Sequence, residues 1–482
     1  MSSASNQSKT NLEKMSPIEL RASASLASIY GLRMLGMFLI LPIFAIYAST
    51  LPGGDSQLMI GLALGAYGLT QAIFQLPFGM ASDRFGRKRV IYVGLVLFVI
   101  GSLVAGFAHD LSTIILGRSI QGAGAVSAAV TALAADLTRE EHRTKAMAMI
   151  GTTIGITFAL SLILGPVLNQ WIGVPGIFLL TGALATAAIF VVKYVVPDPV
   201  SSHFHSDAQA QTGKLKEVLK DTQLLRLNFG IFALHAAQMA MFVVVPFAIN
   251  QSSNLTTNQH WLIYLPVLLL SFVLMVPAII IGEKRAKLKQ IFVGAIALML
   301  AAQLLFAFSI TYFWGIVFSL GAYFIAFNIL EATLPSIISK IAPAASKGTA
   351  IGVYNTTQSL GVFVGGTAGG YLAHHYSNSA VFVFCSVLMA LWLIFAFSMK
   401  KPPAVKSKMY HLKKISADQA KKLAVALSGL KGVRETVVLA EEGVAILKVD
   451  MQQDWDEAAV LKLIGRSEEH TSELQSHHVI SY

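Results

Sequence analysis

Long apolar runs dominate this chain and restrict what it can fold into. Each run is about 20 residues long, the length that an α-helix needs to cross the hydrocarbon core of a bilayer. The 482-residue chain is 55% hydrophobic and only 13% charged, so one or two soluble domains would not bury its apolar surface. We therefore expect an all-α membrane protein with twelve transmembrane helices, from runs that begin near Leu26, Leu58, Val90, Leu111, Ala146, Ile172, Leu227, Leu262, Ile291, Phe313, Thr349 and Ala380.

The Lys and Arg residues lie in alternate loops between these runs. The basic loops fall within residues 84–89, 139–145, 214–220, 283–289, 340–347 and 400–408. The loops without Lys or Arg are 51–57, 169–175, 251–260 and 374–379. Because basic loops stay in the cytoplasm, we expect a multi-pass protein with both termini on that side. The net charge of +11 has the same origin, and no basic and aromatic interleaving indicates nucleic-acid binding.

The chain also repeats itself. A shift of 200 residues places the charged segment 83–89 on the charged segment 283–289. We therefore expect two six-helix halves in the same orientation, one at 25–196 and one at 223–400. A polar N-terminal tail at 1–24 precedes them, and a cytoplasmic linker at 197–222 joins them. A parallel repeat of this kind predicts a site between the halves, near the middle of the bilayer.

After the last apolar run the composition becomes that of a small soluble domain. A basic linker at 401–409, suited to anionic lipid, leads into an α+β domain at 410–465. Its expected order is that of a ferredoxin-like βαββαβ motif, truncated before the last strand. The expected elements are a strand at Tyr410–Ile415, a helix at Ser416–Leu430, a hairpin of Val433–Ala440 and Val444–Val449, and a helix at Asp454–Ile464.

The C-terminal residues and the cysteine content exclude several kinds of structure and site. Residues 466–482 contain RSEEHTSELQS, which resembles a translated sequencing adapter, so we expect a non-native tail there. Cys385 is the only cysteine, which excludes a disulfide framework and a thiolate metal site. No motif for a nucleotide is present either, because the glycines near residue 365 follow no strand. We expect no metal and no cofactor.

The segment 79–90, called the signature segment below, carries a family resemblance. Gly79, Asp83, Arg84, Gly86, Arg87 and Lys88 stand in the spacing of the signature loop of the major facilitator superfamily. Arg118, Gln121, Gly122 and Gly124 resemble the fourth-span motif of its proton-coupled members. In the fifth span the antiporter motif is only partial: Gly165 and Pro166 are in place, but Ser161, Asn169 and Gln170 replace glycines. The resemblance implies a secondary transporter of the bacterial inner (plasma) membrane that works by alternating access, and not an enzyme.

The resemblance also implies a conformational latch in the signature segment. In related transporters the aspartate equivalent to Asp83 lies against the N-terminal end of the eleventh span, here near Gly348 and Gly352. A helix N-terminus carries about half a positive charge, which favours a carboxylate there. The family also pairs a loop arginine with an acid at the end of span four, for which Arg87 and Asp136 are the candidates. The alternative is that these residues only fix topology and a tight turn.

Ionisable side chains inside spans are costly to bury and are therefore candidates for function. Glu331, with Asn328 one turn earlier, is the first candidate for proton coupling or substrate binding, because a carboxyl group removed from water holds its proton more readily. The alternative is a structural partner for a basic group. His235 is either a coupling residue or an interfacial histidine. Arg118 resembles the family's proton-linked arginine.

Further polar residues lie within the spans. Arg33 could balance a carboxylate, contact an anionic substrate or extend to the cytoplasmic surface. Gln71, Gln75, Asn355 and Gln358 either line the cavity or bond between helices.

These features favour proton-coupled efflux of a small, possibly hydrophobic solute by antiport. The alternatives are a proton and solute symporter, or a membrane sensor that signals through its C-terminal domain. The expected partners are a small-molecule substrate, protons and membrane lipid, but no nucleic acid. The C-terminal domain is expected to contact either the cytoplasmic gate or a second copy of the chain.

Overall fold

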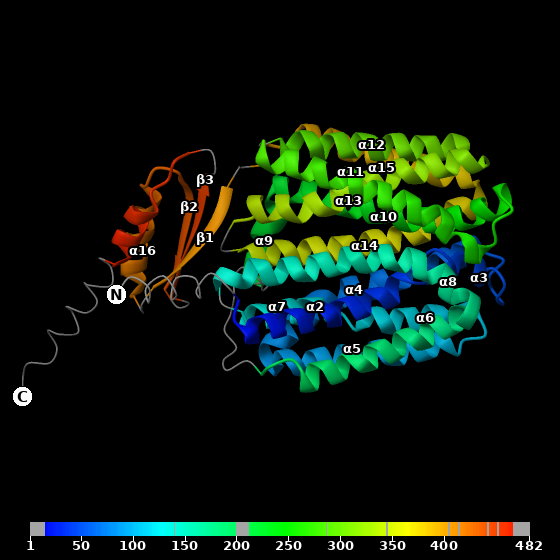
Figure 1. Ribbon diagram of the computed structural model, residues 1–482, viewed down its shortest axis with the longest axis horizontal. Helices are drawn as coiled ribbons and strands as arrows, with labels where there is room; N and C mark the ends of the chain where they lie inside the picture. Colours follow the sequence, from blue (N-terminus) through cyan, green and yellow to red (C-terminus); the bar gives the residue numbers. More distant parts are fainter. Residues whose placement is uncertain are drawn as a thin grey trace, which may run out of the picture.

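The protein is a long helical bundle with a small domain at one end (Figure 1). The computed structural model describes residues 15–138, 140–198, 212–285, 287–343, 346–402, 405–412, 415–440, 443–450 and 453–465. The expected non-native tail at 466–482 lies outside these residues, as does most of the N-terminal tail. Below, the domain end of the bundle is the end beside the C-terminal domain, and the far end is the opposite one, where the short helix α3 lies (Figure 1).

The first half of the bundle contains seven of the helices that the structure describes. They are α2 (Pro17–Phe38), α3 (Phe44–Ala48), α4 (Gln57–Phe85), α5 (Arg87–Gly106), α6 (Leu111–Ala123), α7 (Ser127–Asp136) and α8 (Glu140–Tyr194). A capping box at Ser16 starts α2: the Ser16 side chain accepts from the backbone N–H of Glu19, and the Glu19 carboxylate accepts from that of Ser16. In α8 the backbone breaks at Gly173, where φ is 66°, so this long helix contains a kink.

The second half follows the amphipathic helix α9 (Thr212–Lys220) in the linker. It contains α10 (Thr222–Ser252), the 3₁₀ turn η1 (Thr257–Gln259), α11 (Trp261–Lys284), α12 (Leu288–Ser309), α13 (Phe313–Ile341), α14 (Lys347–His375) and α15 (Asn378–Phe397). In Figure 1 the first half, in blue to blue-green, and the second, in green to orange, run side by side along the bundle.

Eight helices in the described part of the chain are long and apolar enough to cross a membrane by length and composition. The difference from the twelve expected runs has a physical explanation. The fifth and sixth runs are two helical segments of α8 that meet at the Gly173 kink, and the fourth run is divided between α6 and α7. The first and eleventh runs form α2 and α14, which are more polar than the others. The structure therefore has a helix for each run, but the number of membrane crossings stays a prediction.

Helix α14 packs between the two halves through two glycine faces. A Cβ at Gly366 would collide with the backbone of Gly61 in α4 of the first half. A Cβ at Gly365 would collide with the backbone of Ala236 in α10, within the second half. The glycines of α14 therefore serve close helix packing, as the sequence indicated, and they let one helix contact both halves.

The C-terminal domain has a three-stranded antiparallel sheet in the order β1-β3-β2. Its elements are β1 (Val405–His411), α16 (Ala417–Ser428), β2 (Val433–Leu439) and β3 (Val444–Asp450), and residues 457–465 are helical. Helix α16 starts with a capping box at Ser416, the expected N-cap. The side chains of Leu423 and Leu427 on α16 form a core with Ala445 and Leu447 on β3.

One boundary in this domain was predicted wrongly. The first strand begins at Val405 and not at Tyr410, so part of the expected 401–409 linker is sheet. The reason lies in the tertiary structure. Val405 pairs with Asp450, the last residue of β3, so β1 begins five residues before Tyr410. The turn expected at Glu441 to Gly443 lies partly outside the described residues.

Candidate functional site

The signature segment is mostly helical and not an open loop. Helix α4 continues to Phe85 and α5 begins at Arg87, so the turn is made by Gly86 alone, with φ at 94°. Such a φ is readily adopted only by glycine. Gly79 lies inside α4, where a Cβ would lie 3.4 Å from the Cβ of Ala128 on α7. That distance is ordinary van der Waals contact, so the packing of α4 and α7 has room for a Cβ at Gly79.

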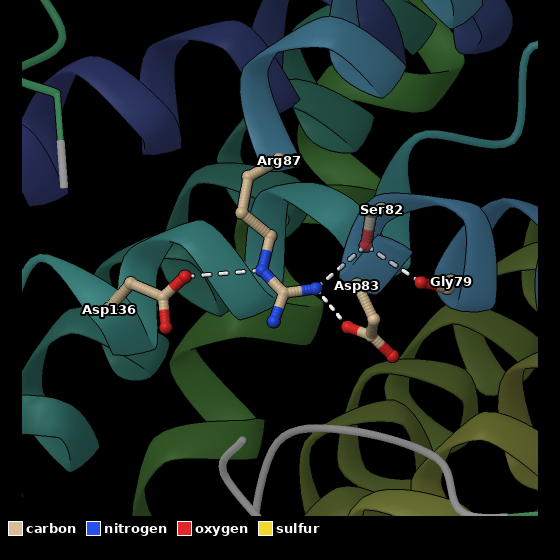
Figure 2. Close-up of polar contacts among 5 residues, drawn as sticks. All are labelled: Gly79, Ser82, Asp83, Arg87 and Asp136. Carbon is tan, nitrogen blue, oxygen red and sulfur yellow. Dashed lines mark hydrogen bonds and ion pairs between the residues drawn. The ribbon is translucent and has the colours of Figure 1, made fainter. Parts of the chain in front are cut away.

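Arg87 joins three helices at the domain end (Figure 2). Its guanidinium is buried and lies between two carboxylates, Asp136 at the end of α7 and Asp83 near the end of α4. Nε donates to Asp136 Oδ2 at 3.1 Å, while Nη1 donates to Asp83 Oδ1 and, at 2.9 Å, to Ser82 Oγ. The structure therefore brings together the Arg87 and Asp136 pair that the resemblance implied.

The other basic residues of the signature segment have separate contacts. Arg84 is exposed, and its guanidinium lies 5.5 Å from the centre of the Phe85 ring. Lys88 Nζ donates to the backbone oxygen of Val196 at 2.7 Å and pairs with Asp198 at the same distance. Lys88 thus binds the carbonyl end of α8, where the negative end of a helix dipole favours a cation.

A cavity of about 50 Å³ lies between α4, α7 and α14. Asp83 lines it from α4, and Gly348 and Gly352 line it from the first turns of α14. Gln75 and Asn355, two of the predicted cavity residues, line it as well. Asp83 therefore faces the N-terminal end of α14, in the arrangement that the resemblance implied.

Two further arginines are buried inside the first half. The side chain of Arg33 donates from Nη2 to the Tyr67 hydroxyl at 2.6 Å and from Nη1 to Ser127 Oγ at 3.1 Å. Arg118 donates to Gln121 Oε1 at 3.1 Å, and its guanidinium lies 5.0 Å from the centre of the Tyr67 ring. Because Arg33 is only 2% exposed, the expectation that it extends to the cytoplasmic surface is wrong. Neither arginine forms an ion pair with a carboxylate in the described part of the chain.

The second half buries an acid and a histidine at its centre. His235 on α10 and Glu331 on α13 approach to 3.8 Å between Nε2 and Oε2. The Glu331 side chain is 35% exposed and that of His235 is 9% exposed. His235 lies 13 residues inside α10, so the interfacial interpretation is wrong.

The contacts of His235 assign its tautomer. Nδ1 lies 3.2 Å from the backbone oxygen of Ile231, to which it can only donate. Nε2 lies 2.7 Å from the amide nitrogen of Gln358, from which it can only accept. The imidazole is therefore neutral in this arrangement, with its proton on Nδ1. Gln358 thus belongs to the Glu331 site and not only to helix packing.

The remaining predicted residues play other parts. Asn328 donates from Nδ2 to Ser271 Oγ on α11 at 2.7 Å, so it fixes α13 against α11. Gln71 is half-buried on α4 and lies outside the lining of the Asp83 cavity.

Two contacts between the halves were missed from the sequence. The ring of Phe158 on α8 lies 5.6 Å from that of Phe327 and 6.3 Å from that of Phe324, both on α13, one and two turns before Glu331. At the far end, Asn169 Nδ2 donates to Asn258 Oδ1 at 2.7 Å, which links α8 to η1. The only signal for Asn169 was its departure from the antiporter motif, and aromatic residues are too frequent in spans to single out Phe158.

Comparison with known protein families agrees with the geometry of the signature segment. A sequence model of the Major Facilitator Superfamily matches residues 26–366 and 330–439. The chain belongs to the major facilitator superfamily. It is therefore a secondary transporter and not an enzyme, as the signature segment implied.

Individual relatives agree with this membership. The chain is 42% identical over 438 residues to the inner membrane transport protein YajR of Escherichia coli (strain K12), covering 91% of this chain and 96% of that protein. It is 33% identical over 389 residues to the uncharacterized transporter BU466 of Buchnera aphidicola subsp. Acyrthosiphon pisum (strain APS), covering 80% and 99%. It is 25% identical over 379 residues to the quinolone resistance protein NorA of Staphylococcus aureus (strain MRSA252), covering 74% and 91%.

A solved structure agrees at the level of the fold. The crystal structure of a bacterial homolog to the human lysosomal transporter Spinster, in an inward-facing and occupied conformation, has a TM-score of 0.64 at 14% sequence identity. The match covers 81% of this chain and 98% of that one. The helical bundle therefore has the fold of the superfamily.

Proposed function

We propose that this protein is a proton-coupled transporter that exports a small, hydrophobic solute by antiport. The observation that carries the proposal is the Glu331 carboxylate, held next to His235 inside the bundle and still partly exposed. A carboxyl group in such a place can bind and release a proton without leaving the protein. The name of NorA, a quinolone resistance protein, supports an exported drug-like solute.

Glu331 and His235 can bind the proton together. A proton gained by His235 would go to Nε2, which would stop accepting from Gln358 and become a donor facing Glu331. The two groups would then form an ion pair that shares the proton. Release of that proton would restore the hydrogen bond between Gln358 and His235. Because Gln358 lies on α14, which packs between the two halves, this hydrogen bond links the protonation of His235 to the interface between the halves.

Access to this site would alternate through two closures. One turn from Glu331, Phe158 packs against Phe327, and at the far end Asn169 bonds to Asn258. At the domain end, the Asp83 carboxylate faces the N-terminal end of α14. We propose that separation at one end accompanies closure at the other, with Asp83, Arg87 and Asp136 as the latch of the domain end.

The membrane arrangement belongs to the same proposal. Twelve spans would follow if α2, the α6–α7 pair and α14 cross the bilayer with the eight apolar helices, and if α8 crosses twice. The basic loops support a cytoplasmic location for the domain end and for both termini. The name of YajR supports the inner membrane as the location. The sheet order and helices of the described part of the C-terminal domain support the βαββα portion of a ferredoxin-like domain.

A substrate-free experiment tests the proton site. Spin labels at Trp171→Cys and Asn254→Cys, both exposed at the far end, report the distance between the halves at pH 5.5 and pH 8.5. We expect the wild-type distance distribution to change with pH. We expect Glu331→Gln, which cannot bind a proton, to give one distance distribution at both pH values, while Glu217→Gln, at an exposed position on α9, behaves like wild type. A Glu331→Gln protein that responds to pH like wild type would remove Glu331 from the proton path.

Proteoliposomes separate antiport from the alternatives. With norfloxacin as the quinolone probe, antiport predicts accumulation in vesicles with an acidic interior. Symport predicts accumulation in vesicles with an alkaline interior. A sensor predicts binding of norfloxacin with no flux under either gradient.

A further inference from the structure

Lys448 on β3 is a charged side chain buried between the C-terminal domain and the helical bundle. It lies on the central strand of the sheet and is only 5% exposed. Its neighbours Leu447 and Val449 point to the domain core beneath α16, so the alternation of a strand turns Lys448 to the opposite face. Figure 1 shows the sheet between α16 and the ends of the helices, so this face is turned to the bundle.

The ammonium group of Lys448 has partners on both sides of that boundary. Within the domain, Nζ pairs with Glu435 Oε2 on β2 at 2.7 Å. In the bundle, Nζ donates to the backbone oxygen of Ala342 at 2.7 Å and lies 3.4 Å from that of Lys340. Ala342 is the C-cap of α13, where backbone carbonyls lack helical partners and the helix dipole is negative. A lysine is well suited to this position.

The loop that Lys448 contacts connects the two functional helices. Ala342 follows α13, which carries Glu331 eleven residues earlier, or about 16 Å along the helix. Four residues after Ala342, at Ser346, begins the cap of α14, whose Gly348 and Gly352 line the Asp83 cavity. Within α13, Pro335 lies between Glu331 and the contact with Lys448, at a position where a helix bends readily. A displacement of Ala342 therefore moves α13, which carries Glu331, and α14, which lines the Asp83 cavity.

From this geometry we propose that the C-terminal domain is a clamp that holds the α13–α14 loop through Lys448. The pairing with Glu435 fixes the lysine side chain on the sheet and so determines the position of the clamp. The bound clamp stabilises the closed arrangement of α14 against Asp83. Its release loosens the first turn of α14 and makes the domain end easier to open. The consequence for transport rests on the proposed latch, but the contact itself does not.

Hydrogen exchange in the full-length protein, reconstituted in nanodiscs, measures the clamp without any substrate. The peptide over residues 346–352 reports the first turn of α14, and a peptide within α16 reports the folding of the domain. In Lys448→Met we expect exchange at 346–352 to become about tenfold faster, the factor for a lost hydrogen bond from a charged group. Exchange in α16 should stay unchanged. Because this readout includes no transport, its failure is distinguishable from failure of the proposed antiport.

A matched variant separates the clamp from general damage to the domain. Lys408→Met removes the ion pair of Lys408 with Glu457, which lies wholly within the domain. We expect Lys408→Met to leave exchange at 346–352 at the wild-type rate. Equal rates at 346–352 in Lys448→Met and wild type would overturn the proposal, and so would equal acceleration in both variants.

Cross-linking gives a second measurement that does not depend on exchange rates. The only native cysteine, Cys385, is buried in α15, so introduced cysteines react selectively. A short bismaleimide should join Ala342→Cys to Ile446→Cys in native membranes, because Ile446 lies two residues from Lys448 on the same face of β3 and leaves Lys448 intact. Lys287→Cys, at the N-cap of α12, and Lys462→Cys, in the last helix of the domain, are both exposed and should not be joined. No cross-link between positions 342 and 446 in a folded protein would also overturn the clamp.

Discussion

The two halves of the bundle hold different ionisable side chains in their interiors. In the first half the interior holds Arg33 and Arg118, while in the second half it holds Glu331 and His235. Arginine stays protonated in proteins, so the first half carries a constant positive charge. Carboxyl and imidazole groups gain and lose protons, so the second half can change its charge. A sequence repeat that predicts similar backbones therefore accommodates two different kinds of chemistry.

The latch residues show the same asymmetry. Arg87, Asp83 and Asp136 form a connected group in the first half. The sequence shift places Glu283 and Lys287 at the corresponding positions of the second half. The comparison suggests that the first half works as a conformational lock and the second half as the proton site. The following variants test that division, from the largest expected effect to the smallest.

Asp136→Asn should have the largest effect on stability. The Asp136 side chain is fully buried against Arg87, and removing one partner of a buried ion pair costs about 3 kcal/mol or more. The Asp83 side chain is 35% exposed, so Asp83→Asn should cost under about 1 kcal/mol and act mainly by lowering transport. Thermal unfolding in detergent measures the first effect, and norfloxacin flux measures the second. Glu283→Gln is the second-half counterpart of Asp83→Asn and should leave norfloxacin flux at the wild-type level, so an equal loss of flux there would end the proposed division.

Arg118→Met tests whether the buried cation of the first half serves transport. Because Arg118 has no carboxylate partner among the described residues, an apolar replacement leaves no opposite charge unpaired. We expect a melting temperature at or above that of wild type and a norfloxacin flux reduced at least about tenfold, or about 1.4 kcal/mol in the barrier. Arg285→Met, at an exposed position, should keep normal flux. Unchanged flux with a lower melting temperature in Arg118→Met would assign Arg118 to structure alone.

Asn169→Ala should have the smallest effect, because it removes one neutral hydrogen bond between the halves. Such a bond contributes about 1 kcal/mol, which corresponds to about a fivefold shift toward the open far end. The spin-label distance between positions 171 and 254 measures this shift. Gln170→Ala, at the exposed neighbouring position, should leave the distribution unchanged. A distribution equally unchanged in Asn169→Ala would mean that the far end is closed by the Phe158 contacts alone.

Much of the site could be predicted residue by residue. The cost of burying charge in lipid singled out Arg33, Arg118, His235 and Glu331, and all four lie in the interior. The family resemblance supplied the Arg87 and Asp136 pair and the position of Asp83 near α14. The partners of the four buried residues could not be predicted. They depend on how each helix is rotated, and a change of one residue turns a side chain by about 100° around the axis.

The sequence by itself determined the class of this protein: apolar runs that only a bilayer can cover, basic loops that orient them, and a signature segment that identifies the superfamily. Only the tertiary structure decided which groups meet. It placed Gln358 on His235, Phe158 on Phe327 and Lys448 on Ala342, pairs separated by more than 100 residues. The physical reason is that hydropathy and charge act on each segment separately, whereas these contacts form only when the packing of helices fixes the rotation of every side chain.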